Sequence, residues 1–258
     1  MATKTADVVV IGGGVNGASI AMHLAKLGAG RVVLVEKGGL ATGATGRSGA
    51  MVREHYLHPT LVRMAMEASE IFHNFDDAVG GDARFQKTGR LLMFPESERG
   101  AVEANVAMNR ELGVNIQTIT PDEIGELIPQ ASLDDISIGV YEPDSGYADP
   151  VATTYAFAAQ AEALGARILT HTEVTGIRVF AGRVAAVETR EGDIETHVAV
   201  NVAGAWSNLL GGPIGEVMPI TPTRVQMTHF ASPTGSGVAN HERDRLHDRR
   251  LLPCGRGT

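Results

Sequence analysis

The stretch VVVIGGGVNG at residues 8–17 decides the fold of this chain. Its first four residues read as a buried strand that runs into a glycine turn, and an amphipathic helix follows from Ala18 to Leu27. A second strand, Arg31–Val35, ends at Glu36, about 20 residues after the glycines. This order of strand, turn, helix, strand and acid predicts a βαβ unit that binds a dinucleotide.

The glycines of this motif have separate physical roles. Gly12 permits the tight turn, Gly14 leaves the backbone open to close approach by a pyrophosphate, and Gly17 lets the helix pack against the strand. The helix N-terminus offers free N–H groups and the positive end of its dipole to the phosphates. Glu36 can accept hydrogen bonds from a ribose diol. The alternative is a structural turn that binds nothing, and the complete βαβ context argues against it.

Composition and charge exclude several classes of function. Of the 258 residues, 43% are hydrophobic and 20% are charged, as in an ordinary globular protein. A net charge of −8 argues against nucleic acid or an anionic membrane as the main partner, and no apolar run approaches the ~20 residues of a membrane span. The single cysteine, Cys254, excludes an internal disulfide and a cysteine-cluster metal site, so no metal is expected. Because no signal peptide precedes the first strand, we expect a cytoplasmic protein.

Periodicity predicts the remaining elements. Helices are expected at Pro59 to about Val79, Ser97–Leu112, from Thr120, and at Asp149–Leu164, and strands at Leu91–Phe94, Ile138–Tyr141, Arg167–Thr170, Glu173–Val179, Val184–Thr189 and Thr196–Val200. Two turns, at residues 181–182 and 191–193, separate three of the later strands as a meander. A strand through Val202 then enters a glycine turn and a helix near Trp206.

A loop of small residues, 38–50, follows Glu36 directly. Such a loop costs backbone entropy and buries little surface. We expect it to lie close to a ligand that orders it. A plain flexible linker is the alternative.

Several separated segments, taken together, are more specific than any of them alone. They are residues 12–28 with Glu36, 44–53, 87–91, 144–150, 172–177, 203–207 and 219–226. In their order and spacing they resemble the FAD-dependent amino-acid and amine oxidoreductases of the D-amino-acid oxidase superfamily. Glycine oxidase, monomeric sarcosine oxidase and the beta subunits of sarcosine oxidase and dimethylglycine dehydrogenase-like enzymes are the most similar members. The resemblance covers about residues 7–230.

The resemblance implies an α/β fold with a Rossmann-like FAD-binding domain of the glutathione-reductase type. This domain is expected at residues 1–85 and 145–215. An interleaved α+β substrate domain, incomplete here, is expected at residues 86–144 and 216–232. Residues 233–258 are charged and aperiodic, and we expect a disordered or aberrant tail. Because relatives are longer, the chain resembles a C-terminally truncated or frameshifted member whose authentic sequence ends near Ser232.

The resemblance also implies the contacts with FAD. Gly12, Gly14 and Gly17 shape the turn. The other expected contacts are Val15 and Asn16 at the pyrophosphate, Glu36 and Lys37 at the adenosine ribose, Ala44 and Thr45 along the pyrophosphate and ribityl path, Gly49, Ala50 and Met51 at the flavin ring, Val174 at adenine, and Gly204 and Trp206 closing over the dinucleotide.

Two residues are expected at the substrate. Arg53 matches an arginine that helps bind the substrate carboxylate in sarcosine oxidase-like members, and a planar guanidinium suits a carboxylate. A surface ion pair with Glu54 or another acid is the alternative. His55 lies two residues further along and is a candidate for a position near the flavin, but a structural or surface histidine is the favoured interpretation.

The expected reaction oxidises the C–N bond of a small amino acid or a secondary or tertiary amine, such as sarcosine, dimethylglycine or glycine, to an imine that water hydrolyses. Oxygen or another acceptor takes the electrons, and partner subunits are possible. One alternative is an inactive or partner-dependent fragment or subunit of such an enzyme. Another is an FAD-dependent hydroxy-acid or glycerol-phosphate dehydrogenase. An NAD-dependent Rossmann dehydrogenase is disfavoured by the 44–53 loop and by the meander before Gly204.

Overall fold

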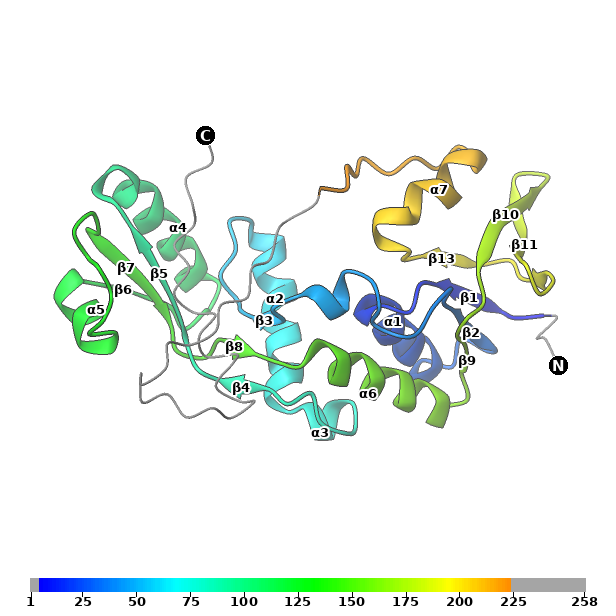
Figure 1. Ribbon diagram of the computed structural model, residues 1–258, viewed down its shortest axis with the longest axis horizontal. Helices are drawn as coiled ribbons and strands as arrows, with labels where there is room; N and C mark the ends of the chain where they lie inside the picture. The colour runs from blue at the N-terminus through cyan, green and yellow to red at the C-terminus, as the bar shows by residue number, and fades with distance from the viewer. Residues whose placement is uncertain (1–4, 224–258) are drawn as a thin grey trace, which may run out of the picture.

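The computed structural model describes residues 5–223 (Figure 1). The segment 224–258, which holds the expected tail and the end of the 219–226 motif, lies outside the described residues. Two regions can be distinguished by their sheets. The β1 region contains β1 (Val8–Ile11), α1 (Val15–Lys26), β2 (Val32–Val35), α6 (Pro150–Ala163), β9 (Arg167–Leu169), β10 (Val174–Phe180), β11 (Arg183–Thr189), β12 (Ile194–Glu195), β13 (Ala199–Asn201), the 3₁₀ helix η3 (Gly204–Trp206), α7 (Ser207–Gly211) and η4 (Gly212–Ile214).

The β7 region is built on β5 (Arg90–Phe94), η2 (Glu96–Glu98), α4 (Arg99–Glu111), β6 (Gln117–Ile119), α5 (Pro121–Leu127) and β7 (Ile138–Glu142). Between the two regions lie η1 (Thr45–Arg47), β3 (Met51–Val52), α2 (Pro59–His73), α3 (Phe75–Ala78), β4 (Gln86–Lys87) and β8 (Gly146–Tyr147). In Figure 1 the two regions lie at opposite ends of the long axis, with α2 and β8 between them.

The main sheet is parallel, with the strand order β13-β1-β2-β9. β1 lies between its two neighbours: Val9 pairs with Val33 of β2 on one side and with Ala199 of β13 on the other. The predicted strand–turn–helix–strand unit is confirmed, although α1 begins at Val15 rather than at Ala18. Because all four strands run in one direction, the ends of β1, β2 and β13 meet at one edge, where ligands bind in folds of this type.

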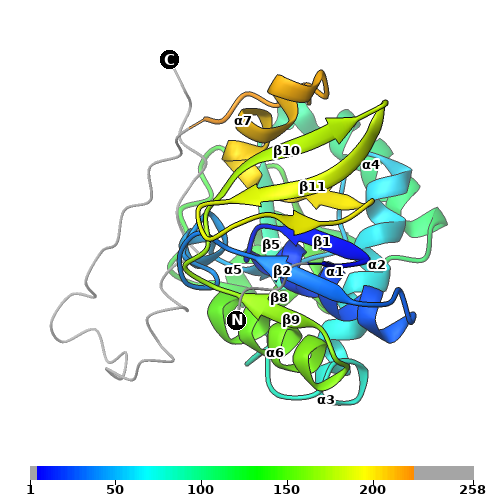
Figure 2. The ribbon, with the colours of Figure 1, turned by 90° about the vertical axis from the view of Figure 1, so that its right-hand side faces the viewer.

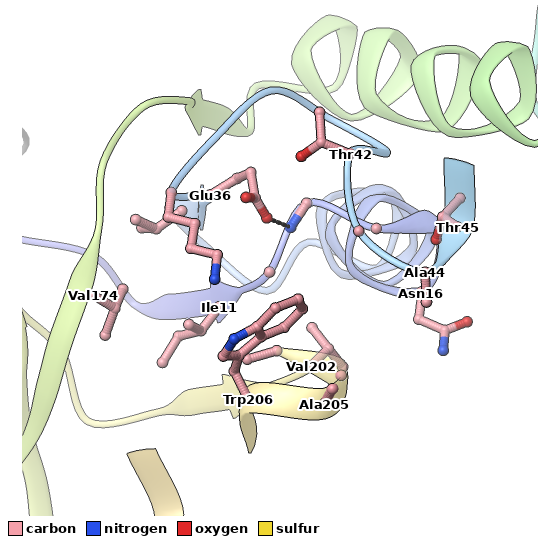
Figure 3. Close-up of a pocket in the computed structure, with 18 of the residues that line it drawn as sticks. Ile11, Asn16, Glu36, Thr42, Ala44, Thr45, Val174, Val202, Ala205 and Trp206 are labelled. Carbon is pink, nitrogen blue, oxygen red and sulfur yellow. Dashed lines mark hydrogen bonds between the residues drawn. The ribbon is translucent and has the colours of Figure 1, made fainter. Parts of the chain in front are cut away.

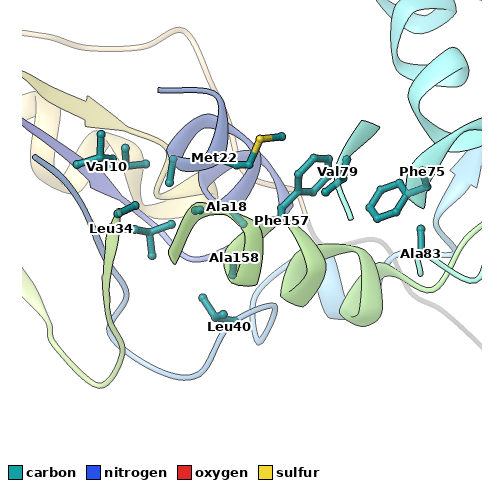
Figure 4. Packing of buried hydrophobic residues seen from close by; sticks show 14 of the residues in the cluster. Val10, Ala18, Met22, Leu34, Leu40, Phe75, Val79, Ala83, Phe157 and Ala158 are labelled. Carbon is teal, nitrogen blue, oxygen red and sulfur yellow. The ribbon is translucent and has the colours of Figure 1, made fainter. Parts of the chain in front are cut away.

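Alternate side chains of the sheet pack against two different layers. Val10 and Leu34 belong to a core shared with Met22 of α1 and Phe157 of α6 (Figure 4). The intervening residues, such as Val9, pack against the meander and α7. In Figure 2 the meander lies above the sheet and α6 below it. Strands covered on both faces explain the unbroken apolar run at residues 8–11.

The meander β10-β11-β12 is antiparallel, as expected. The predicted strand Thr196–Val200 is confirmed only at Ala199 and Val200, which belong to β13 of the main sheet, whereas the third strand of the meander is β12, which ends at Glu195. Thr196 lies at this transition: its hydroxyl donates to the carbonyl oxygens of Asp7 and Val198, at 3.2 and 3.0 Å, and accepts from the N–H of Val198 at 3.2 Å. These hydrogen bonds hold the chain where it crosses from the meander to the main sheet.

The β7 region has an antiparallel sheet of order β5-β7-β6 and its own core. The core packs Val140 of β7 with Val102 and Val106 of α4. Val62 of α2 belongs to this core, whereas Phe72 of the same helix packs against the core of the β1 region. α2 therefore ties the two regions together.

The predicted helix from Pro59 to Val79 is broken at Asn74, and this part of the prediction is wrong. Asn74 leaves the helical conformation with φ −124° and ψ 39°. Its side-chain amide donates to the carbonyl of Glu70 at 3.0 Å. An asparagine side chain that competes for a helical carbonyl ends the helix there, and apolar periodicity alone does not register it.

Candidate functional site

A pocket of about 410 Å³ lies at the carboxyl edge of the parallel sheet (Figure 3). Four stretches of chain meet around it: the glycine turn after β1, the end of β2 with the loop that follows, the segment before β10, and the segment from the end of β13 into α7. Its lining residues are Ile11, Gly12, Gly13, Gly14, Asn16, Val35, Glu36, Lys37, Thr42, Gly43, Ala44, Thr45, Arg47, Thr172, Glu173, Val174, Val202, Ala203, Gly204, Ala205, Trp206, Leu209 and Leu210.

The glycine turn is fixed by tight contacts. Gly12 has φ +120°, and a Cβ on it would lie 2.5 Å from the carbonyl oxygen of Val202. A Cβ on Gly17 would lie 1.8 Å from the carbonyl oxygen of Gly12, so the first turn of α1 rests directly on the glycine turn. Any side chain at either position would force β1, α1 and β13 apart. Both roles predicted from the sequence, a tight turn and close helix packing, fit these contacts.

Glu36 joins the turn to the loop after β2. Its carboxylate accepts a hydrogen bond from the N–H of Gly13 at 2.7 Å through Oε2, and from the N–H of Gly38 at 2.8 Å through Oε1. Each carboxylate oxygen has two lone pairs, so each retains one for a further donor. The carboxylate is partly exposed in the pocket and can still receive the two hydroxyls of a ribose.

The small-residue loop is held against the glycine turn by the chain itself. The N–H of Ala41 donates to the carbonyl of Gly13 at 2.9 Å, and the hydroxyl of Thr45 accepts from the N–H of Val15 at 3.1 Å. The loop contains the short helix η1, which the sequence did not predict. These contacts argue against a plain flexible linker. They also place the Thr45 hydroxyl and the N-terminus of α1 on the same side of the pocket.

Lys37 and Trp206 meet across the pocket. The Lys37 Nζ lies 3.8 Å from the centroid of the Trp206 ring. Trp206 is 42% exposed, and its ring occupies the centre of the view in Figure 3, beside Ile11. A lysine ammonium over an indole face is a cation–π contact. The two residues expected at the ribose and at the closing side of the site are thus in contact with each other.

Most of the residues expected to contact FAD line this one pocket: Gly12, Gly14, Asn16, Glu36, Lys37, Ala44, Thr45, Val174, Gly204 and Trp206. Val15 and Gly17 lie behind the lining in the first turn of α1. Gly49, Ala50 and Met51 lie outside the lining, where the chain enters β3. Ala50 has φ +45°, and Met51 is 58% exposed.

Arg53 and His55 lie beyond the pocket, after β3. The Arg53 guanidinium stacks over the Tyr56 ring, 4.2 Å from its centroid, and Nη1 donates to the carbonyl of His55 at 2.9 Å. Among the ion pairs of residues 5–223, none joins Arg53 to Glu54. His55 is 7% exposed, and its Nε2 is hydrogen-bonded to Oδ1 of Asn105.

A buried carboxylate fixes this segment, and sequence reasoning missed it. Glu142, at the end of β7, is 2% exposed and accepts from the backbone N–H groups of Glu54 and His55 at 3.2 and 3.1 Å. The Ser145 hydroxyl and the Arg90 guanidinium also donate to it, each at 2.9 Å. We call these five residues the Glu142 cluster.

The charge state of the Glu142 cluster follows from these contacts. Burial raises the pKa of Glu142, but the imidazole of His55, whose Nδ1 lies 3.6 Å from Oε1, the charge of Arg90 and the hydrogen bond from Ser145 outweigh it and lower the pKa to about 2. Burial lowers the pKa of Arg90, and the charge of Glu142 opposes that effect. The cluster therefore holds an ionised pair in the interior, which fixes the backbone next to Arg53.

Sequence reasoning also missed part of the pocket lining. Ile11, Gly13 and Val35 were read only as strand or turn residues, although they adjoin the motif. Thr172 and Glu173 stand in a quoted family-like segment without an assigned role, and Arg47 stands in another. Leu209 and Leu210 carry no local signal, because only the return of α7 over the sheet edge brings them to the pocket.

Comparisons with known proteins agree with this geometry. The DAO family, described as FAD dependent oxidoreductase, matches residues 7–254. The chain belongs to this family. DAO-family members depend on FAD, and the glycine turn and Glu36 at the end of β2 are the features that a bound dinucleotide requires. The match extends past residue 230, where we expected the resemblance to end, and runs into the segment 233–258.

Several similar proteins are dehydrogenases or oxidases of amines or amino acids by name. Mitochondrial sarcosine dehydrogenase from Mus musculus is 32% identical over 256 residues, covering 95% of this chain and 27% of that protein. Sarcosine oxidase subunit beta from Rhodobacter capsulatus is 28% identical, covering 86% of this chain and 55% of that protein. Among solved structures, L-proline dehydrogenase from P. horikoshii has a TM-score of 0.77 at 32% identity, covering 82% of this chain and 56% of that chain.

Glycine oxidase from Bacillus cereus has a TM-score of 0.69 at 30% identity, covering 81% of this chain and 58% of that chain. These likenesses confirm the α/β fold with a Rossmann-like FAD-binding region. The chain spans about a quarter of the length of the sarcosine dehydrogenase it matches and a little over half of the glycine oxidase.

Residues 5–223 contain neither a membrane-spanning helix nor a cluster of metal ligands. There, no helix is long and apolar enough to cross a membrane, and no group of three or more His, Cys, Asp and Glu side chains is placed to hold a metal ion. The cytoplasmic location expected from the sequence stays a prediction, since several relatives are mitochondrial proteins by name.

Proposed function

We propose that this chain binds the adenosine diphosphate half of FAD in the pocket and serves the oxidation of a C–N bond in a small amino acid or a secondary or tertiary amine. The observation that carries the proposal is the junction of three features at one sheet edge. These are the glycine turn under the N-terminus of α1, the Glu36 carboxylate, and the Lys37–Trp206 contact. The division into an FAD-binding domain, 1–85 and 145–215, and a substrate domain, 86–144 and 216–232, is part of this proposal.

The pocket fits the cofactor on several counts. The Gly12 and Gly17 contacts leave no room for side chains, so backbone amides form this part of the wall. The N–H of Val15 donates to the Thr45 hydroxyl, whereas the next N–H groups of the first turn of α1 have no partners within the helix and suit a pyrophosphate. Gly43 and Gly204 both line the pocket, and a Cβ on either would meet open space. Asn16, Ala44 and Thr45 would lie along the phosphates, and Val174 would lie at the adenine.

Arg53 is the residue that we propose to bind the substrate. In the proposal its guanidinium binds a substrate carboxylate, with Gly49, Ala50 and Met51 on the path toward the flavin ring. When bound, FAD accepts two electrons from the substrate C–N bond, and water hydrolyses the resulting imine. The buried position of His55 and its hydrogen bond to Asn105 favour a role in holding the Arg53 segment rather than contact with the substrate.

The substrate class follows from relatives that act on sarcosine, dimethylglycine, glycine or proline by name. The electron acceptor is oxygen or another oxidant. A second proposal is a chain that needs a partner to complete its site. It is favoured by the share of the relatives that the chain spans and by the sarcosine oxidase beta subunit, which is a subunit by name. A hydroxy-acid or glycerol-phosphate dehydrogenase remains the further alternative.

The test begins with the visible absorption spectrum of the purified chain, after incubation with FAD and removal of the excess. Flavin bands retained at one equivalent support the cofactor site. Bleaching of those bands under nitrogen by sarcosine, dimethylglycine, glycine or proline, and not by lactate or glycerol 3-phosphate, supports C–N oxidation. A folded chain that retains FAD but is reduced by none of these compounds favours the partner-dependent reading. A folded chain that retains no flavin contradicts the cofactor site.

A further inference from the structure

The Lys37–Trp206 contact crosses the sheet edge at its centre. Lys37 follows β2 and Trp206 ends η3, which follows β13. β2 and β13 are the two neighbours of β1 in the sheet. The contact therefore passes over the end of β1, where the glycine turn begins, and the 3.8 Å separation leaves no space between the ammonium and the ring for another group. Both side chains also line the pocket.

The charges around the pocket show which kind of ligand this contact suits. Its charged lining residues are Glu36, Lys37, Arg47 and Glu173. Glu36 accepts from the N–H groups of Gly13 and Gly38, and Lys37 contacts the indole ring rather than one of the two acids. Among the ion pairs of residues 5–223, none involves Lys37. Its ammonium is held in the pocket next to the turn where phosphates are proposed to lie.

We propose that Lys37 and Trp206 form a clasp that selects phosphorylated adenine nucleotides over the neutral nucleoside. This inference rests on the proposed function. A ligand that lies along the sheet edge must part the ammonium from the ring. A nucleotide phosphate then takes the ammonium as its counter-ion, while the freed indole packs against the ligand. Adenosine breaks the same contact and supplies no anion in return, so the clasp costs it affinity.

The chain contains one tryptophan, so its fluorescence reports on the clasp alone. Trp206 emission would be followed during titration with ADP and, separately, with adenosine, neither of which is a flavin. The test variant is Lys37→Met, which keeps the length of the side chain and removes the charge. The matched control is Lys26→Met, at the exposed C-terminal end of α1. Lys37→Arg restores a cation that can sit over the ring.

The expected results concern both spectra and affinity ratios. Before any ligand is added, Lys37→Met shifts the Trp206 emission and Lys26→Met does not. Lys37→Met binds adenosine about two- to fivefold more tightly, because the contact no longer has to be broken. It also binds ADP more weakly, so the preference for ADP over adenosine falls by about tenfold, and Lys37→Arg regains most of that preference.

Two results would overturn the clasp. If the wild-type chain binds ADP but Lys37→Met keeps the wild-type preference and emission, the clasp is wrong and the proposed cofactor site stands. If the folded wild-type chain binds neither ADP nor FAD, the clasp and the proposed function fall together. Circular dichroism of each variant separates these results from a loss of folding.

Discussion

The glycine turn at the end of β1 and the buried carboxylate of Glu142 both hold a loop in place, but with different chemistry. At the turn, backbone groups of the turn itself bind the loop: the carbonyl of Gly13 accepts from the N–H of Ala41, and the N–H of Val15 donates to the side-chain hydroxyl of Thr45. At Glu142 a fully buried charge gathers donors from β5, from the segment after β3, and from the turn before β8.

The two arrangements place their groups for different purposes. At the pocket, glycine residues let a ligand approach the backbone closely and leave hydrogen-bonding groups for it. A buried ion pair uses its hydrogen bonds internally and fixes a neighbouring segment instead, which is the one that carries Arg53. We therefore expect substitutions at the turn to act through shape, and substitutions in the Glu142 cluster to act through charge.

The largest effect is expected from Gly17→Ala. The new Cβ would lie 1.8 Å from the carbonyl oxygen of Gly12, which is backbone and cannot move aside. We expect a loss of more than about 4 kcal/mol of unfolding free energy, or no stable β1 region. Urea unfolding followed by circular dichroism measures it. The control is Gly100→Ala, where a Cβ meets open space. Equal stability of the two variants would contradict the role of shape.

Glu142→Gln tests the role of charge. It removes the partner of the Arg90 guanidinium, which is only 15% exposed, and one acceptor for the N–H groups of Glu54 and His55. Leaving a buried charge uncompensated costs about 3–5 kcal/mol. The same unfolding measurement applies, with Glu126→Gln on the exposed face of α5 as the control. A change below about 1 kcal/mol would show that the cluster does not anchor the β7 region.

The ionisation of Glu142 should also appear in the pH dependence of the unfolding free energy. The folded-state pKa of Glu142, about 2, lies below its ordinary value of 4.5. Its stabilisation is therefore complete above about pH 4.5 and is lost as the pH falls toward 2, by roughly 3 kcal/mol in total. Unfolding free energies of the wild-type chain and Glu142→Gln would be compared between pH 5 and pH 2. Parallel curves would contradict the assignment, because the variant must lack this part of the slope.

The smallest effect is expected at Glu36, on binding. Glu36→Gln keeps one oxygen but loses the charge that receives ribose hydroxyls, so ADP should bind about ten- to a hundredfold more weakly. The variant also disturbs the hydrogen bonds to Gly13 and Gly38. For that reason 2′,3′-dideoxy-ADP serves as the comparison: it lacks the hydroxyls, and its affinity should fall much less. Equal losses for both ligands would assign Glu36 to the loop alone.

The difference between the two regions also explains what the sequence could predict. The strand at residues 8–11, the glycine turn and Glu36 lie within one βαβ unit, and their spacing follows from helix and strand geometry. The Glu142–Arg90 pair joins residues 52 positions apart, and no local pattern marks either of them as buried. The Lys37–Trp206 contact likewise depends on β13 returning beside β1.

The errors in secondary structure have a similar cause. Asn74 and Thr196 interrupt elements whose apolar periodicity continues past them. In both places a polar side chain hydrogen-bonds to a backbone carbonyl where the element is interrupted. Asn74 binds within its own helix, whereas Thr196 binds Asp7, which only the tertiary fold brings near. The interruption at Asn74 is local and could be sought in a sequence, but the one at Thr196 could not.

The central claim is that FAD binds at the sheet edge of the β1 region. Hydrogen–deuterium exchange of the full chain, with and without FAD, tests it most directly. The account predicts slower exchange at residues 12–17, 36–47 and 202–206 when FAD is present, and unchanged exchange in β5, β6 and α5. Protection centred in the β7 region, or none at the glycine turn while FAD is bound, would contradict it.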